Sequence, residues 1–94
     1  MTVTVVDAPE QSRFKLWNDD ALIGLADYVI EDGTITFTHT EVNTDRRNKG
    51  LGATLVGGAL DQVRSEGTYR VVAACPFVAH FITENTAYQE LLAA

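Results

Sequence analysis

Residues 34–63 show two different spacings of apolar residues, and the change between them predicts the centre of the fold. From Thr34 to Val42 apolar and polar residues alternate, which is typical of a strand with one buried face. From Leu51 onward the apolar residues recur at helical spacing and form one stripe: Leu51, Leu55, Val56, Ala59, Leu60 and Val63. The chain therefore passes from a strand, through a short turn, into an amphipathic helix.

The alternating segment has two faces of different chemistry. Period two places one face on Ile35, Phe37, His39 and Glu41, while four threonines share the other. The first face grades from apolar to polar toward the turn. We expect His39 to be a hydrogen-bonded core histidine that orients the strand, and Glu41 to lie on the face that leads into any site at the turn.

The residues before this strand predict further antiparallel strands. Residues 3–7 are β-branched and predict an edge strand or an arm, and residues 13–17 and 21–31 predict a hairpin. Asn18-Asp19-Asp20 and Glu31-Asp32-Gly33 supply the turn chemistry between them.

After the helix, Gly67 is expected to act as its C-terminal cap. Residues 71–75 form a continuous apolar run, typical of a central strand covered on both faces. Pro76 can begin a helix whose apolar stripe is Phe77, Val78, Phe81 and Ile82. A last short helix groups Tyr88, Leu91 and Leu92. The order predicts a single domain, residues 1–94, of the mixed α/β (α+β) class, in which a strand–turn–helix–strand crossover follows antiparallel strands.

Length, charge and cysteine content narrow the class further. The chain has 94 residues, a net charge of −6 and one cysteine, Cys75. An acidic chain does not suit the phosphate backbone of nucleic acid. No apolar run approaches the roughly 18 residues of a membrane span, and the N-terminus lacks the features of a signal peptide. A lone thiol fits a reducing compartment, so we expect a cytoplasmic protein without a membrane partner.

The turn between strand and helix concentrates positive charge. Three of the seven Lys and Arg residues, Arg46, Arg47 and Lys49, fall within four positions, next to Gly50 and Gly52. The free N–H groups at a helix N-terminus favour a phosphate, and glycines let the backbone approach it closely. The turn is interpreted as a phosphate site; the alternative is an ordinary strand-to-helix turn.

Other phosphate motifs do not fit this turn. A dinucleotide fingerprint needs a third glycine where Leu55 stands, and no Gly-Lys-Ser or Gly-Lys-Thr occurs. The loop Arg47-Asn48-Lys49-Gly50-Leu51-Gly52 instead resembles the Arg-x-x-Gly-x-Gly pyrophosphate loop of the GNAT superfamily of acyl-CoA-dependent N-acetyltransferases. His39-Thr40-Glu41-Val42 and Cys75-Pro76-Phe77-Val78 resemble flanking blocks of its short members, and the resemblance covers residues 13–92.

The resemblance implies acetyl-CoA, with coenzyme A as product, as the cosubstrate and an amine as the acceptor. The backbone amides of the loop would hold the pyrophosphate: Arg47, Asn48, Lys49, Gly50, Leu51 and Gly52. Val42 would line the pantetheine arm, and Arg46 or Lys49 would reach the ribose phosphate.

Two residues are candidates for catalysis, and each has an alternative. Glu41 could draw a proton from an ammonium nucleophile, or be a solvated charge at a strand end. Cys75 could accept an acyl group near a thioester, or be a buried small hydrophobe. His80 is expected on the surface, and the two histidines and one cysteine lack the spacing of a zinc site.

The sequence departs from the family pattern in three places. Asn48 replaces a usual glycine, Glu84-Asn85-Thr86 replaces a usual His-Pro, and Ala73 stands where proline is common. Because asparagine tolerates positive φ, the loop should survive. If the histidine of His-Pro contributes to acceptor binding in relatives, the acceptor differs here.

The favoured interpretation is an acetyl-CoA-dependent N-acyltransferase in which an acceptor amine attacks the thioester directly. One alternative is a non-catalytic acyl-CoA-binding or sensing module, which would need Arg47, Gly50 and Gly52 but not Glu41 or Cys75. The second alternative is a structural domain without a cofactor. A small-molecule or protein amine as acceptor, and a monomer or a homodimer, remain open alternatives.

Overall fold

Five strands pair in sequence order to form one sheet. In the computed structural model, which describes residues 2–43 and 50–93, the strands are β1 (Val3–Ala8), β2 (Arg13–Asn18), β3 (Ala21–Glu31), β4 (Thr34–Val42) and β5 (Arg70–Ala73). The first four are antiparallel and β5 is parallel to β4. The α+β class and the antiparallel N-terminal strands are confirmed.

The predicted turns have the backbone conformations that their residues favour. At the β3–β4 turn both Asp32 (φ 50°) and Gly33 (φ 77°) adopt positive φ. A two-residue hairpin turn of this kind matches the right-handed twist of its strands. Asp19, in the β2–β3 turn, also adopts positive φ, at 51°. A short 3₁₀ helix, η1 (Pro9–Gln11), joins β1 to β2.

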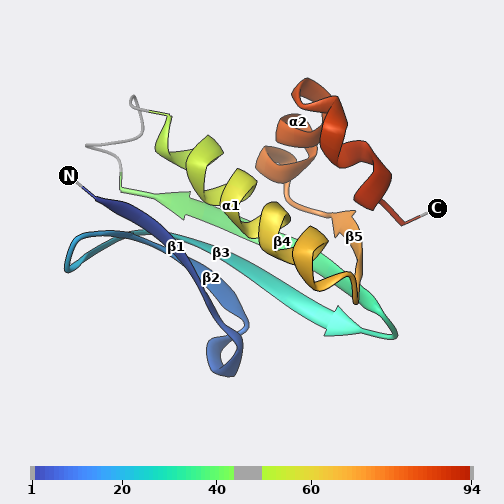
Figure 1. Ribbon diagram of the computed structural model, residues 1–94, viewed down its shortest axis with the longest axis horizontal. Helices are drawn as coiled ribbons and strands as arrows, with labels where there is room; N and C mark the ends of the chain where they lie inside the picture. The colour runs from blue at the N-terminus through green and yellow to red at the C-terminus, as the bar shows by residue number, and fades with distance from the viewer. Residues whose placement is uncertain (1, 44–49, 94) are drawn as a thin grey trace.

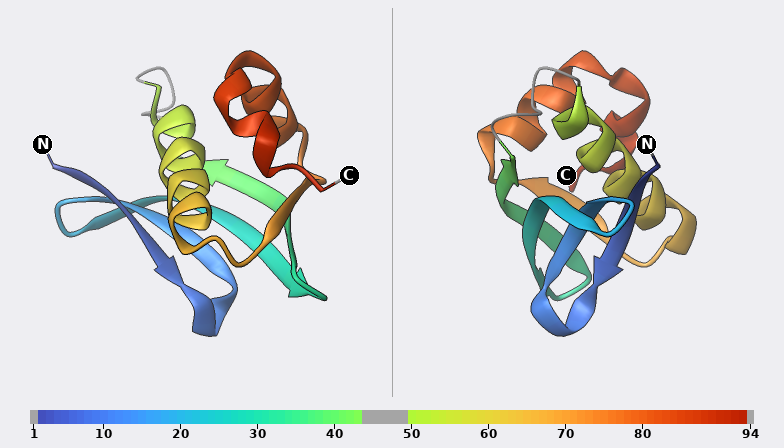
Figure 2. Two further views of the ribbon diagram at one scale, coloured as in Figure 1. Left: turned by 45° about the vertical axis from the view of Figure 1, so that its right-hand side comes forward. Right: turned by 90° about the vertical axis from the view of Figure 1, so that its left-hand side faces the viewer.

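The helices cover one face of the sheet and leave the other uncovered (Figures 1 and 2). They are α1 (Leu51–Glu66), α2 (Pro76–Glu84) and the 3₁₀ helix η3 (Thr86–Leu91). Every residue of the predicted α1 stripe is buried. Gly67 ends α1 with φ 68° and donates its N–H to Val63 O, as a left-handed C-cap does. The face of the sheet under α1 is called the inner face and the opposite one the outer face.

The inner face and α1 approach each other closely. A Cβ on Gly58 would lie 2.7 Å from Val5 Cγ2, so α1 can lie against β1 only because this position has no side chain. Gln62 Nε2 donates a 2.9 Å hydrogen bond to Val5 O at the same contact. Three rings, Phe14, Tyr28 and Phe37, pack together in the core, with centroids 5.5 to 6.2 Å apart.

The prediction that residues 71–75 form a central strand is wrong, because β5 is the edge of the sheet. Val71 is fully buried, but Val72 faces outward and is 39% exposed. The free edge of β5 is partly capped by the C-terminal segment: Leu92 bridges to Val71, and Ala93 N donates to Val71 O at 2.9 Å. A continuous apolar run therefore indicated a strand without showing where in the sheet it lies.

A bulge in β4 overturns the predicted alternation of that strand. Tyr28 pairs with Phe37 and Asp27 with His39, which leaves Thr38 without a partner on β3. The extra residue reverses the faces beyond it. Ile35 and Phe37 are buried on the inner face, but His39 and Glu41 lie on the outer face with their side chains 55% and 62% exposed. His39 is therefore not a core histidine.

In the part of the chain that the structure describes, no helix is long and apolar enough to cross a membrane.

Candidate functional site

The candidate site lies where β4 separates from β5. Their pairing runs from Thr34–Arg70 to Phe37–Ala73, and a last hydrogen bond joins Cys75 N to Phe37 O at 2.9 Å. Beyond the bulge, no described strand pairs with residues 38–42 on this side of β4. The backbone groups along that edge, apart from the Thr40 N–H that contacts Cys75, can therefore pair with an extended ligand, as they would with another strand.

Cys75 and Thr40 meet across this divergence. Cys75 Sγ lies 3.5 Å from Thr40 Oγ1, and Cys75 is 6% exposed. Cys75 precedes Pro76, the first residue of α2, and so occupies the N-cap position of that helix. Proline suits this first position because it lacks an N–H there and has a fixed φ. The bulge, which the sequence did not reveal, turns Thr40 toward Cys75.

The environment of Cys75 favours its thiolate. Burial alone would raise the pKa of the thiol, but hydrogen bonds from the Thr40 side chain and from the backbone of Val78 and Phe77 outweigh burial, so the pKa is lowered from its ordinary value of 9.0. N–H groups at the start of a helix stabilise negative charge in this way. The thiol is therefore more acidic than a simple buried hydrophobe would be.

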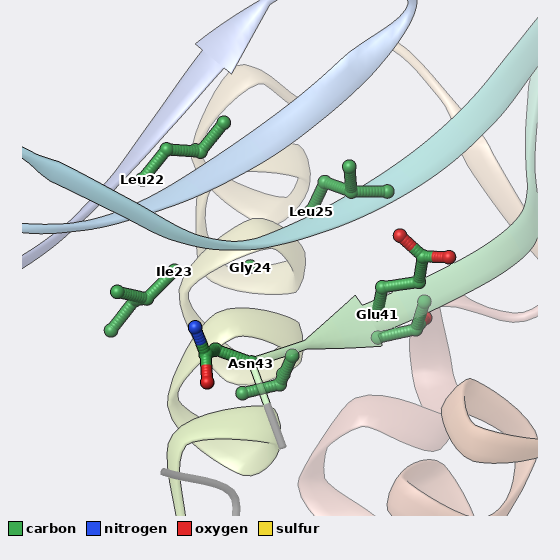
Figure 3. A pocket seen from close by; sticks show the side chains of 8 residues that line it. Leu22, Ile23, Gly24, Leu25, Glu41 and Asn43 are labelled. Carbon is green, nitrogen blue, oxygen red and sulfur yellow. The ribbon is translucent and has the colours of Figure 1, made fainter. Parts of the chain in front are cut away.

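Glu41 lies on the other side of β4, paired with His39. Their Oε1 and Nε2 atoms are 3.0 Å apart. Glu41 borders an open hollow of about 590 Å³ lined by Leu22, Ile23, Gly24, Leu25, Thr40, Glu41, Val42 and Asn43. Leu22, Leu25 and Glu41 point to one side of the two strands, and Ile23 points to the other (Figure 3). The two candidate catalytic residues, Glu41 and Cys75, thus lie on opposite faces of β4.

The start of α1 provides part of the predicted phosphate loop. Gly50 has φ 71°, a left-handed conformation that glycine adopts without strain. Leu51 is 4% exposed, so its side chain belongs to the core and not to a ligand site. A Cβ on Gly52 would lie 2.5 Å from Phe77 Cζ, so the Phe77 ring packs directly against the backbone of Gly52. Arg46, Arg47, Asn48 and Lys49 lie outside the described residues.

Val42 and Gly24 pack against each other at the same end of the sheet. Val42 is half-buried, and its Cγ2 would lie 3.4 Å from a Cβ on Gly24. Such a Cβ would also lie 3.0 Å from Glu41 O, a tight contact that would require a small shift of β4. The valine predicted to line the pantetheine arm therefore lies at the end of β4, beside Gly24 of β3.

A second hollow, of about 220 Å³, lies between α1 and α2 and was not predicted. It is lined by Ala53, Phe77, His80, Phe81, Glu84 and Asn85. Within the predicted apolar stripe of α2, Val78 and Ile82 are buried, whereas Phe77 is 46% exposed. His80, with its side chain 75% exposed, lies on the surface as predicted. An exposed phenylalanine cannot be distinguished from a buried one by spacing alone.

Comparisons with known proteins agree with this fold. Residues 13–91 match a family model described as GCN5-related N-acetyl-transferase. Among solved structures, the chain is similar to the NMR solution structure of a GCN5-like protein from Staphylococcus aureus, with a TM-score of 0.71 and 19% identity. The match covers 97% of this chain and 88% of that one. No curated protein matches the chain.

Proposed function

Because the chain belongs to the GCN5-related N-acetyltransferase family, we propose that it transfers an acetyl group from acetyl-CoA to a primary amine. The observation that carries this proposal is the separation of β4 from β5 after Phe37, which leaves the edge of residues 38–42 without a strand partner among the described residues. The same end of the sheet adjoins the start of α1, where Gly50 has the positive φ that a tight phosphate loop needs.

Two features of the described residues fit acetyl-CoA. The free edge of β4 offers hydrogen bonds to the amides of the pantetheine arm, with Val42 beside it. The N–H groups of the first turn of α1, from Leu51 onward, have no partner within the helix and would bind the pyrophosphate. From the sequence, Arg47, Asn48 and Lys49 would complete the loop around it, and Arg46 or Lys49 would reach the ribose phosphate. The cosubstrate supplies the thioester carbonyl that the acceptor amine attacks.

Glu41 is proposed as the base. Its carboxylate takes a proton from the acceptor ammonium, directly or through a water, and frees the nitrogen lone pair. The new C–N bond forms as the C–S bond breaks, and the coenzyme A thiolate takes the second proton of the nitrogen. His39, 3.0 Å from Glu41, holds the carboxylate on the outer face, where an acceptor can reach it.

Cys75 is proposed as a contact to the acyl end of the cosubstrate, with Thr40 orienting its thiol. Its position on the opposite side of β4 from Glu41 favours direct attack by the amine over an acyl-cysteine. Mass spectrometry after mixing with acetyl-CoA tests this choice: unmodified Cys75 during turnover supports direct attack, and a transient acetyl-sized mass increase at Cys75 contradicts it.

A sensing module is the second candidate, because Glu41 and Cys75 do not face each other. The two functions separate in a paired experiment. Acetyl-CoA and coenzyme A, but not ATP, should raise the melting temperature of both the wild type and Glu41→Gln, since a ligand of the native state stabilises it. Turnover with an amine should fall about 10²- to 10⁴-fold in Glu41→Gln.

The matched control is Glu31→Gln. Glu31 is an exposed carboxylate at the other end of β3, so this variant should keep full activity. Cosubstrate binding without turnover in the wild type would favour the sensing module, and the absence of any thermal shift would contradict both functions.

A further inference from the structure

A row of three side chains crosses the outer face at the proposed acceptor site. Lys15 on β2 pairs with Leu25 on β3, and Leu25 pairs with Glu41 on β4. Residues paired directly across antiparallel strands project to the same face. The row therefore presents a cation, an apolar side chain and an anion in that order. The backbones of Lys15 and Glu41 lie about 10 Å apart, because neighbouring strands lie roughly 5 Å apart.

Lys15 differs from the other described cations. Arg13 is paired with Asp27 at 2.8 Å, Arg64 with Glu90 at 3.1 Å, and Arg70 donates to Leu92 O at 3.1 Å. Among the residues that the structure describes, Lys15 has no carboxylate within 4.0 Å and no hydrogen-bonded acceptor. A free cation on a chain with a net charge of −6 is available to an anionic group of a ligand.

The surroundings of the row limit which ligand it fits. On one side the apolar pair Trp17–Leu22 extends the surface of Leu25, and on the other side the Arg13–Asp27 ion pair is neutral overall. One end of the row is therefore the unpaired cation of Lys15, and the other end is the exposed carboxylate of Glu41, whose partner is His39. The aliphatic surface between them suits a stem of methylene groups.

We propose that the acceptor is a small zwitterion, an amino acid whose reactive amine is separated from its carboxylate by a chain of about five methylene groups. This inference rests on the proposed acetyl transfer. The ammonium binds Glu41, which removes its proton, the stem lies on Leu25, and the carboxylate binds Lys15. Lys15 and Leu25 thus become specificity-determining residues of the reaction.

The test compares amines that differ only at the far end. 6-Aminohexanoate and hexylamine have similar stems, but only the first has a carboxylate. Wild-type kcat/KM should be about three- to tenfold higher for 6-aminohexanoate, the range expected for one partly exposed charged contact. The preference for 6-aminohexanoate over hexylamine should vanish in Lys15→Met, which lacks the cation, and persist in the control Arg70→Gln. In Lys15→Glu, where the charge is reversed, hexane-1,6-diamine should become the preferred acceptor.

Two results would overturn the proposal while leaving acetyl transfer in place. One is equal turnover of 6-aminohexanoate and hexylamine by the wild type. The other is a preference for Nα-acetyl-lysine amide, which has an amine on a stem but no carboxylate and would indicate a peptide acceptor. A failure of acetyl-CoA to raise the melting temperature would instead remove the proposed function itself.

A binding readout keeps the inference testable where turnover is slow. In NMR spectra of the labelled protein saturated with coenzyme A, 6-aminohexanoate should shift the amide resonances of Lys15, Leu25 and Glu41 at lower concentration than hexylamine does. Equal responses to the two ligands, or the same difference in Lys15→Met, would contradict the assignment of Lys15.

Discussion

The two halves of β4 have the same alternating sequence but different structures. Residues 34–37 pair on both sides, with β3 and β5, and bury Ile35 and Phe37 under the helices. Residues 38–42 begin with a bulge, pair only with β3 among the described strands, and place Thr40 toward Cys75 and Glu41 toward solvent. The first half stabilises the fold and the second half carries the candidate chemistry. A single unpaired residue, Thr38, separates the two.

The largest expected effect is on the stability of the first half. Phe37 is 1% exposed and contacts the rings of Phe14 and Tyr28. Phe37→Ala should lower the free energy of unfolding by about 3 to 5 kcal/mol, because it leaves a cavity in a packed core. Chemical denaturation measures this loss. A loss below about 1 kcal/mol would mean that the core collapses into the space left by the Phe37 ring, and that the first half of β4 contributes little to stability.

A smaller effect, on proton binding, is expected for Thr40→Val in the second half. The Thr40 hydroxyl lowers the pKa of Cys75, so the variant should have a higher thiol pKa, which the ultraviolet absorbance of the thiolate reports. Because the folded-state pKa lies below the ordinary value of 9.0, ionisation of Cys75 stabilises the native state above that pH, and this contribution disappears as the pH falls through the folded-state pKa. The stability advantage of the wild type over Thr40→Val should therefore grow as the pH rises toward 9.0 and above.

Thr36→Val, on the same strand but away from the thiol, is the control for this experiment. It should leave the thiol pKa and its pH dependence unchanged. An equal pKa in the wild type and in Thr40→Val would show that the hydroxyl does not stabilise the thiolate.

The smallest effect is expected from the exposed pair of the second half. His39→Ala and Glu41→Gln should each change the free energy of unfolding by less than about 0.5 kcal/mol, since exposed ion pairs contribute little and no core contact is lost. Thermal or chemical denaturation checks this. A loss of more than about 2 kcal/mol from either variant would assign the pair to the fold rather than to the site.

The sequence predicted those features that depend on neighbours in the chain. The buried stripe of α1 follows from helical spacing, and the β3–β4 turn follows from Asp32 and Gly33, whose positive φ values are local preferences. The site blocks were found because each is a short contiguous motif. Their roles in binding and catalysis stay predictions.

Features that depend on partners far along the chain were missed. The bulge at Thr38 is set by the register between β3 and β4, which no local pattern encodes, and it moved His39 from the expected core to the surface. The edge position of β5 depends on the C-terminal residues that bridge to Val71. The contact of Thr40 with Cys75 was not predicted, because alternation alone placed Thr40 on a face with three other threonines and no candidate site residue.

The most direct test of the contrast within β4 is an NMR titration of the labelled protein with coenzyme A. We expect the amide shifts to concentrate in residues 38–42, in Cys75 and in the first turn of α1 from Gly50, while residues 34–37 change little. Shifts centred on residues 34–37, or no shifts at saturating ligand, would contradict the assignment of the second half of β4 as the cosubstrate site.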